Sequence, residues 1–316
     1  MGGIGDGVSL HGHRESVRVR APGKINVFFE VGDIASDGYH PVASVYQALS
    51  LYEEVTARPS SDFTISVTGD VDVSGVPLDG SNLAMRAARL VARRVEWKGG
   101  VHLDIRKGVP VAGGMGGGSA DAAAALVAVN ELLDGGLTPL ELQELGADLG
   151  ADVPFAVLGG TAIGTGRGDE LAPALARGRF DWVLVTSGEG LSTPTVYGEL
   201  DRLRALPDIA PARGLPQADP AVLQALRSGD AAALAPAIRN DLQEAALSLR
   251  PDLADVLTLG VDAGALAGVV SGSGPTLAFL AADAAASARI VTTLADAGHT
   301  ALAAHGPVPG ARVLDA

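Results

Sequence analysis

A glycine-rich segment followed at once by an alanine-rich run is the first feature of the sequence with chemical potential. Residues 110–126 read PVAGGMGGGSADAAAAL, and five of the six residues from Gly113 to Gly118 are glycine. Glycine lets backbone approach a ligand closely, and a helix start offers unpaired N–H groups with partial positive charge. The pattern predicts an anion site, most often for phosphate, at a helix running from Ser119 to Leu133. A flexible strand-to-helix turn is the alternative, which this density of glycine disfavours.

The glycine segment does not fit the familiar nucleotide-binding motifs. No lysine follows it, as G-x-x-x-x-G-K-[ST] requires. Counted from Gly114, Ser119 stands where the last glycine of G-x-G-x-x-G belongs. The H-R-D and D-F-G elements of protein kinases are missing too. The segment alone therefore indicates phosphate binding without naming a class of enzyme.

Two charged residues, Lys24 and Asp152, supply the other parts that phosphoryl transfer requires. Lys24 lies in APGKINVFFEV between strand-like stretches, and Asp152 lies in GADLGADVPF just beyond a predicted helix. Phosphoryl transfer to an alcohol needs a phosphate cradle, charge neutralisation by Mg²⁺ and a cation, and a carboxylate that accepts the hydroxyl proton. A lysine at a strand edge and an aspartate that forms a turn are the structural alternatives, and these segments by themselves leave them open.

The composition limits the class of protein. The chain has 316 residues, of which 47% are hydrophobic and only 4% aromatic, so packed cores built mostly from Ala, Val and Leu are expected. A formal net charge of −14 disfavours general binding to nucleic acid or anionic membranes. Without cysteine there are no disulfides or thiolate metal sites. No apolar run reaches membrane-spanning length and the N-terminus lacks a signal-peptide core, so a cytoplasmic location is expected.

Local patterns predict elements that place these residues. SVRVRAPGKINVFFEV at 16–31 predicts a strand, a turn at Pro-Gly and a second strand. TPLELQELGADLG predicts a helix with a capping box at Thr138 and Glu141. Strands and helices mix without regular βαβ alternation, which favours an α+β fold. We expect a disordered extension at 1–15, one domain at 16–170 and a second at 171–316.

Three widely spaced segments together resemble the GHMP kinase superfamily. They are APGKINVFFEV, PVAGGMGGGSADAAAAL and VSGSGPTLAFL, in this order. DGYHPVASVYQAL, GADVPF, GGTAIGTGRG and LSTPTVY are similar to the branch that phosphorylates the 2-hydroxyl of a cytidine diphosphate-linked methylerythritol in non-mevalonate isoprenoid synthesis. The resemblance implies two domains, the first like ribosomal protein S5 and the second an α/β sandwich. ATP and the acceptor would bind in the cleft between them.

The resemblance also implies roles for residues at matching positions. Asp152 would be the catalytic base and Lys24 its cationic partner. Asn82 would lie near adenine, and Ser119 would contact Mg²⁺. The ATP-phosphate loop would comprise Pro110, Val111, Ala112, Gly113, Gly114, Met115, Gly116, Gly117, Gly118, Ser119 and Ala120.

The acceptor site is assigned in the same way. Tyr39, His40 and Tyr197 would hold the cytidine end, with Asn26 and Thr193 nearby. Aromatic rings suit stacking on a flat pyrimidine, although packed loop aromatics and a surface histidine are the alternatives without the resemblance.

Asp121, in the first helical turn, would repel a phosphate if it faced one, so we expect it to point away.

Three other functions compete with this hypothesis. Another kinase of the superfamily, acting on homoserine or mevalonate, would share the three motifs but not DGYH and LSTPTVY. A nucleotide sensor without catalysis would tolerate loss of Lys24 or Asp152, and both are present. RNA binding would need a basic stripe, which the sequence does not show. We expect a small-molecule acceptor, no nucleic-acid or membrane partner, and a monomer or homodimer.

Overall fold

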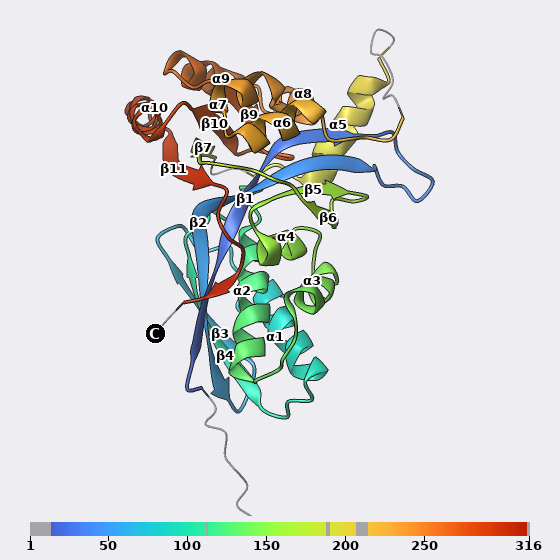
Figure 1. The fold of residues 1–316 in the computed structure, drawn as a ribbon, viewed down its shortest axis with the longest axis vertical. Coiled ribbons are helices and arrows are strands. Elements are labelled where there is room, and N and C mark those ends of the chain that lie inside the picture. The colour runs from blue at the N-terminus through green and yellow to red at the C-terminus, as the bar shows by residue number, and fades with distance from the viewer. Residues whose placement is uncertain (1–13, 112, 188–189, 207–213, 315–316) are drawn as a thin grey trace, which may run out of the picture.

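The computed structural model describes residues 14–111, 113–187, 190–206 and 214–314, and places two sheets one above the other (Figure 1). The larger sheet, with four helices on one face, forms the lower tier. The smaller sheet, with most of the later helices, forms the upper tier. The expected extension at 1–15 lies almost wholly outside the described residues. No helix in the described ranges is long and apolar enough to cross a membrane.

Eight described strands form the larger sheet, with β12-β1-β2-β4-β3 as its main order. β5 extends it from β2 and pairs with β6, and β8 pairs with β1. The strands are β1 (Val17–Val31), β2 (Val42–Ser60), β3 (Thr64–Gly69), β4 (Gly100–Lys107), β5 (Thr161–Thr165), β6 (Glu170–Pro173), β8 (Arg239–Asn240) and β12 (Arg312–Val313). Because β8 and β12 come from the second half of the chain, that half closes back onto the first.

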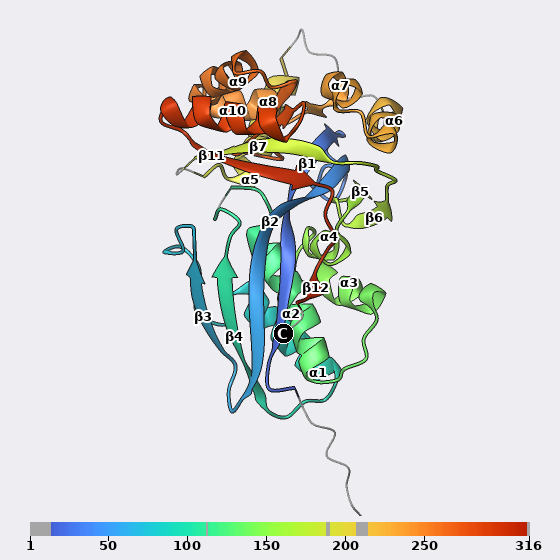
Figure 2. The ribbon, with the colours of Figure 1, turned by 60° about the vertical axis from the view of Figure 1, so that its left-hand side comes forward.

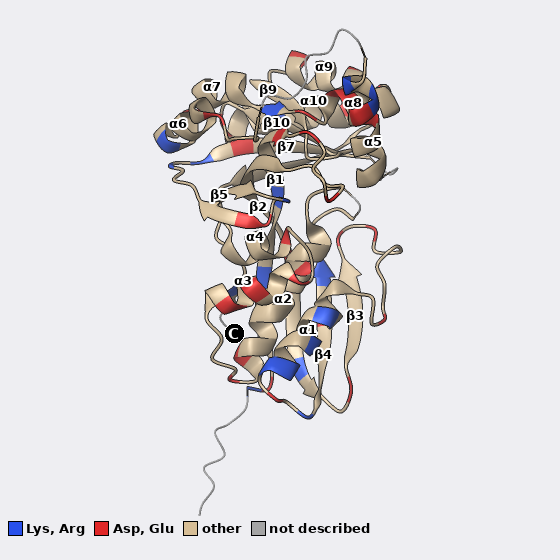
Figure 3. Cartoon of the chain, turned by 90° about the vertical axis from the view of Figure 1, so that its right-hand side faces the viewer, with Lys and Arg blue, Asp and Glu red and all other residues tan. Residues whose placement is uncertain are grey.

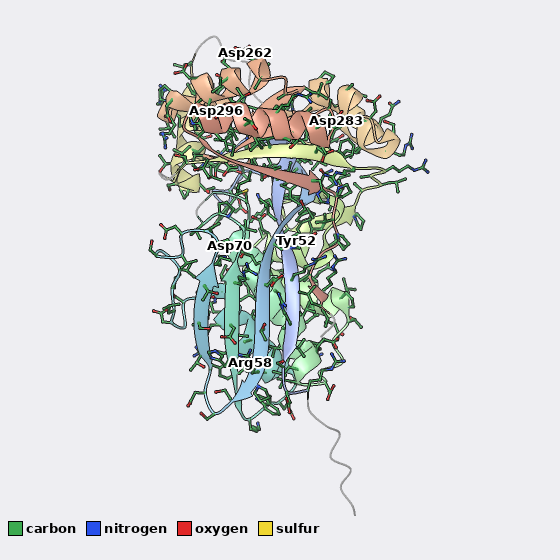
Figure 4. All side chains as sticks on the ribbon, turned by 90° about the vertical axis from the view of Figure 1, so that its left-hand side faces the viewer. Tyr52, Arg58, Asp70, Asp262, Asp283 and Asp296 are labelled. Atoms are coloured by element: carbon green, nitrogen blue, oxygen red, sulfur yellow. The ribbon has the colours of Figure 1, made fainter. Side chains whose placement is uncertain are left out.

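One face of the larger sheet is covered by helices, and the other face carries no described helix in the lower tier (Figure 4). The covering helices are α1 (Leu83–Arg94), α2 (Gly117–Leu132), α3 (Pro139–Ala147) and α4 (Val153–Leu158). Tyr52 and Arg58 stand out from the open face (Figure 4). Six alanines of α2 are fully buried, so α1 and the sheet can approach it closely. The arginines of α1 point outward and make this helix basic (Figure 3).

The smaller sheet is buried on both faces. Its order is β11-β7-β10-β9, all antiparallel. The strands are β7 (Phe180–Thr186), β9 (Ala267–Val270), β10 (Leu277–Ala281) and β11 (Thr300–Gly306). Val183 and Val185 pack on helices above, whereas Trp182 and Leu184 face the larger sheet. Burial on both faces explains why WVLV at 182–185 is a continuous apolar run rather than an alternating one.

The remaining helices belong to the upper tier, and most of them lie over its sheet (Figure 2). They are α5 (Thr193–Arg204), α6 (Pro220–Ser228), α7 (Ala231–Leu234), a 3₁₀ turn (Ala235–Ala237), α8 (Gln243–Leu249), α9 (Asp252–Asp262) and α10 (Ala284–Asp296). The fold class is α+β, as predicted. The boundary near residue 170 stays a prediction, because the β5–β6 hairpin continues the larger sheet to Pro173.

Two local predictions were wrong in detail. Residues 17–31 form one strand rather than two around a turn, because a register shift between Pro22 and Lys24 absorbs the Pro-Gly break. Helix α2 begins at Gly117 rather than Ser119, with Gly116 in the left-handed conformation at its N-cap. The capping box at Thr138 and Glu141 is confirmed. The segment TAIGTGRGDEL forms the β5–β6 hairpin.

Candidate active site

Lys24 and Asp152 meet at the junction of the two tiers. Lys24 is buried on β1, just past the register shift, and its Nζ lies 3.7 Å from Asp152 Oδ2. Asp152 is the partly exposed N-cap residue of α4, and its side chain makes no capping bond there. A carboxylate spared from capping, with an ammonium group beside it, is suited to receive a proton from an acceptor alcohol.

The glycine loop lies against this pair. The backbone N–H of Lys24 donates to the Met115 carbonyl at 3.0 Å. Gly116 has a φ of +71°, and a Cβ built there would lie 3.4 Å from Lys24 Cγ and 3.8 Å from Asp152 Oδ2. Glycine therefore does two things at this position, since it adopts the left-handed conformation and leaves the space between loop and charged pair open.

A cavity of about 360 Å³ follows the glycine loop and the start of α2. Asn82, at its edge, caps α1 by accepting from the Ala84 N–H at 2.9 Å and donates to the Pro77 carbonyl. Ala120 is fully buried and does not line the cavity, and Ala112 lies outside the described residues. The predicted phosphate-loop residues that do line it are Pro110, Val111, Gly113, Gly114, Met115, Gly116, Gly117, Gly118 and Ser119.

The third sequence motif reaches the same place from the small sheet. Its tight loop carries Gly272 and Gly274, both with positive φ. A Cβ on Gly114 would lie 3.2 Å from the Gly274 carbonyl oxygen, and one on Gly272 would lie 3.9 Å from Lys24 Nζ. The glycine loop between β4 and α2 and the loop between β9 and β10 thus pack backbone to backbone beside the charged pair.

A second cavity, also about 360 Å³, is lined by Tyr39, His40 and the β5–β6 turn. The Arg167 guanidinium lies 3.7 Å from the centre of the exposed Tyr39 ring and pairs with Asp37. His40 Nδ1 donates to the Gly32 carbonyl at 2.8 Å, and its Nε2 is 3.3 Å from Asp201. These contacts hold the imidazole in one orientation beside the cavity.

Residues of α5 approach this cavity from the upper tier. The Tyr197 ring lies 5.3 Å from the His40 ring, centre to centre, and burial raises the pKa of its phenol to about 12. Thr193 is hydrogen-bonded to Ser273 of the third motif at 2.9 Å. Of the predicted cytidine-site residues, Tyr39 and His40 line the second cavity and Tyr197 lies against His40, whereas Thr193 contacts the third motif.

Asn26 lies beside Lys24 rather than in either cavity. Its Oδ1 accepts from Lys24 Nζ at 2.9 Å, and its Nδ2 donates to Ser44 Oγ at 2.7 Å. Both ends of the carboxamide are thus committed within the protein.

A buried charged cluster beneath the glycine loop was missed at the sequence level. Lys107 Nζ lies 2.6 Å from Glu53 Oε1 and 2.5 Å from Asp121 Oδ2, and all three side chains are buried. Asp121 thus faces Lys107. Alternation was the available signal: Lys107 continues the inward positions of Leu103 and Ile105 on β4. A lysine that continues a series of inward apolar positions indicates a buried charge.

The described residues contain no group of three or more His, Asp or Glu side chains that could hold a metal by themselves. Ser119, in the first turn of α2 and lining the first cavity, is a hydroxyl donor suited to complement phosphate oxygens around Mg²⁺.

Comparison with known proteins defines the class to which this fold and site belong. The profile for the GHMP kinases N terminal domain matches residues 82–160, and that for the GHMP kinases C terminal matches 222–300. The chain belongs to the GHMP kinase family, and it is a kinase with two domains of that fold.

Its similar relatives narrow the comparison to one activity. A protein of Leifsonia xyli subsp. xyli named 4-diphosphocytidyl-2-C-methyl-D-erythritol kinase is 57% identical over 95% of this chain and 99% of its own. The same name is carried by a relative from Clavibacter michiganensis subsp. michiganensis, 56% identical over 94% of this chain and 96% of its own.

Solved structures agree with this at two levels. A crystal structure of 4-(cytidine 5'-diphospho)-2C-methyl-D-erythritol kinase is 31% identical, with a TM-score of 0.73 over 91% of this chain and 98% of its own. L. major mevalonate kinase, solved with R-mevalonate, has a TM-score of 0.72 at 18% identity over 92% of this chain and 95% of its own, which shows the shared fold alone.

Proposed function

We propose that this protein transfers the γ-phosphoryl group of ATP to the 2-hydroxyl of 4-diphosphocytidyl-2-C-methyl-D-erythritol. The relatives at 52–57% identity over about the whole chain support that acceptor. The observation that carries the chemistry is the Lys24–Asp152 pair, 3.7 Å apart, which lies against the glycine loop. Buried Tyr46 lies between the Lys24–Asp152 pair and the β5–β6 hairpin that lines the second cavity. Burial is the main cause that raises the pKa of its phenol, and the nearby Asp152 carboxylate adds to it.

The division of labour follows from the residues present. The N–H groups at the start of α2 would hold ATP phosphates, because a helix N-terminus and a glycine loop favour anions without needing a lysine. Asp152 would take the proton from the acceptor hydroxyl, and Lys24 would offset negative charge on the transferred group. Bound Mg²⁺ would neutralise the phosphates, with Ser119 as the hydroxyl ligand. Asn82 would sit near adenine at the cavity edge.

The acceptor would be held at its cytidine end. Tyr39 and Tyr197 would stack on the pyrimidine. His40 would hydrogen-bond the edge of the base through Nε2, which would exchange its 3.3 Å contact with Asp201 for the base, while Nδ1 stays on the Gly32 carbonyl. The exposed ring of Tyr39 is supported by Arg167. Thr193, which is hydrogen-bonded to Ser273 of the third motif, would contact the acceptor on the side nearer the glycine loop.

The competing proposal is a different acceptor within the same family, such as homoserine or mevalonate. Structures of those kinases share the fold at 17–18% identity, so they carry no argument about substrate. ATP turnover on the three acceptors separates the proposals. Equal or better turnover on homoserine or mevalonate would overturn the cytidyl acceptor.

The role of Asp152 is tested by Asp152→Asn. Because the amide cannot accept the proton, kcat should fall by about 10²–10⁴-fold while the dissociation constant of an ATP analogue stays within about threefold. Asp148→Asn is the matched control, since Asp148 is exposed at the end of α3, away from both cavities. Normal turnover by the Asp152 variant would show that another group accepts the proton.

We also propose that the protein acts in the cytoplasm as a monomer or homodimer and binds no nucleic acid. The net charge of −14 supports the last point. Sedimentation at micromolar concentration distinguishes the two assembly states.

A further inference from the structure

A directional chain of hydrogen bonds runs from the backbone of β1 to the ammonium group of Lys24. Ser44 Oγ donates to the Phe28 carbonyl at 3.3 Å and accepts from Asn26 Nδ2 at 2.7 Å. Asn26 Oδ1 in turn accepts from Lys24 Nζ at 2.9 Å. Lys24 Nζ completes the chain at Asp152 Oδ2, 3.7 Å away.

The register of β1 and β2 brings these side chains together. Asn26 is paired with Tyr46 across the strands, and Lys24 with Ala48. Residues two apart on a strand share a face, so Lys24 and Asn26 point the same way. An irregularity between Asn26 and Phe28 brings Ser44 within reach of the Asn26 amide. This register shift therefore allows the hydrogen bond between Asn26 and Ser44.

The donor-to-acceptor direction of this series of hydrogen bonds is set at the Phe28 carbonyl, where it begins. A carbonyl oxygen can only accept, so the Ser44 hydroxyl is the donor in its 3.3 Å contact with Phe28. Its lone pairs then face Asn26 and select the amide nitrogen. With the nitrogen held there, the amide oxygen must point at Lys24. If the amide were flipped, its N–H groups would face the ammonium group, which has no lone pair to accept them.

Burial makes this arrangement consequential. Ser44 is fully buried and Asn26 is 2% exposed, so neither has water as an alternative partner. Ser44 lines neither of the two cavities. An effect of Ser44 on turnover therefore does not come from lining either cavity, and the double-mutant cycle below tests whether it passes through Asn26.

We propose that Ser44 is a positioning residue for phosphoryl transfer, which sets the orientation of the Asn26 carboxamide so that its oxygen holds Lys24 beside Asp152. The proposal rests on the proposed kinase activity. It adds that Asn26 is a polar link to Lys24, and that removing the Ser44 hydroxyl loosens the ammonium group without changing either binding cavity.

The first test is a comparison of three substitutions at one site. Ser44→Ala should lower kcat about tenfold, with KM for ATP and for the acceptor within about twofold, because positioning is lost while binding is kept. Ser44→Thr, which keeps the hydroxyl, should restore most of the turnover. Ser44→Cys fills the same space with a weaker hydrogen-bonding group and should resemble Ser44→Ala, so the test stands even if the alanine variant folds poorly.

The second test is a double-mutant cycle. In an Asn26→Ala background, Ser44→Ala should reduce kcat by less than about twofold, because the link through which Ser44 acts is already gone. A merely structural role for Ser44 would give losses that multiply. Ser50→Ala is the matched control: Ser50 lies on the same strand and accepts one backbone N–H, from His305 at 2.9 Å. It should leave kcat unchanged.

The outcomes separate this inference from the proposed function. Wild-type turnover is measured first on the cytidyl, homoserine and mevalonate acceptors, and the cycle is run on whichever acceptor is phosphorylated. Wild-type failure on the cytidyl acceptor contradicts the proposed function alone. Unchanged kcat in Ser44→Ala, a rise in KM without loss of kcat, or multiplicative losses in the cycle would each overturn the positioning role of Ser44.

Discussion

Glu53 shares the buried ammonium group of Lys107 with Asp121 beneath the glycine loop. Burial and the nearby Asp121 carboxylate raise the pKa of Glu53 to about 7, against the opposing attraction of Lys107. Burial also raises the pKa of Asp121, again opposed by Lys107. Two carboxylates and one ammonium group therefore keep an extra proton at a pH where a solvated glutamate has lost its own.

This shared proton makes stability depend on pH in a defined direction. The folded protein keeps the Glu53 proton up to about pH 7, whereas the unfolded chain loses it near 4.5. Between these values the folded state binds more protons, so the free energy of unfolding contributed by Glu53 falls as pH rises. Glu53→Gln, a neutral substitute, should lack this component. Relative to the variant, the wild type should lose up to about 3 kcal/mol between pH 5 and pH 8.

Urea denaturation of both proteins at pH 5, 6, 7 and 8 measures that difference. The pH 5 pair is the internal reference, because Glu53 is protonated in the folded state there. If the difference in unfolding free energy between the wild type and Glu53→Gln stayed constant from pH 5 to pH 8, Glu53 would already be ionised in the folded protein at low pH.

The sequence could predict some of the site residues and their partners, but not all of them. Lys24 and Asp152 were paired because they occur in recognisable segments, and the structure places them together. Glu53 and Ser44 lie in an ordinary-looking strand, so nothing in their spacing shows which side chains they meet. Their partners come from β4, α2 and β1, and such pairing depends on strand register, which a single sequence leaves undetermined.

At the scale of elements, the junction between the glycine loop and α2 carries the most functional constraint. Gly116→Ala should cost about 1 kcal/mol of stability, because an L-residue disfavours a φ of +71°. It should also lower kcat/KM for ATP by about tenfold, because relief of that backbone strain would move the loop N–H groups that lie next to Lys24 and Asp152. Steady-state kinetics and thermal unfolding measure the two effects separately.

Gly136→Ala is the matched control for that substitution. Gly136 has a similar φ of +65°, and a Cβ there meets nothing within 4 Å. It should lose comparable stability with unchanged kinetics. If both variants kept normal kcat/KM, the loop would tolerate a side chain beside Lys24, and the proposed role of Gly116 would be wrong.

Element types were largely predictable, whereas breaks within elements were not. Thr138, Pro139 and Glu141 form a local capping box, so α3 could be placed from neighbouring residues alone. The Pro-Gly break in β1 was misjudged because β2 supplies the compensation: its register shifts opposite Pro22 and keeps the strand continuous. That information lies some thirty residues away along the chain, at Tyr52.

At the scale of the whole molecule, the two tiers share one core. Ile25, Val45 and Leu49 of the larger sheet belong to the same buried cluster as Trp182 and Leu184 of the smaller one. The Trp182 indole also donates to Gln47 Oε1 at 2.8 Å across the junction. A continuous apolar core predicts that the tiers unfold together, although the sequence indicates two domains. The Lys24–Asp152 pair lies at this junction, so a loss of stability there would also disturb the geometry of the proposed active site.

Trp182→Phe tests that coupling. The phenyl ring keeps much of the packing but removes the donor to Gln47, whose Nε2 is buried without a partner among the described residues. An unpaired buried amide should cost about 1–3 kcal/mol, so Tm should fall while calorimetry still gives a single transition. Trp97→Phe is the control, because the indole of half-buried Trp97 donates to Gly100 at 3.4 Å within the lower tier. Two separate calorimetric transitions, either in the wild type or only in Trp182→Phe, would contradict this prediction. They would show that the two tiers unfold independently despite their shared core.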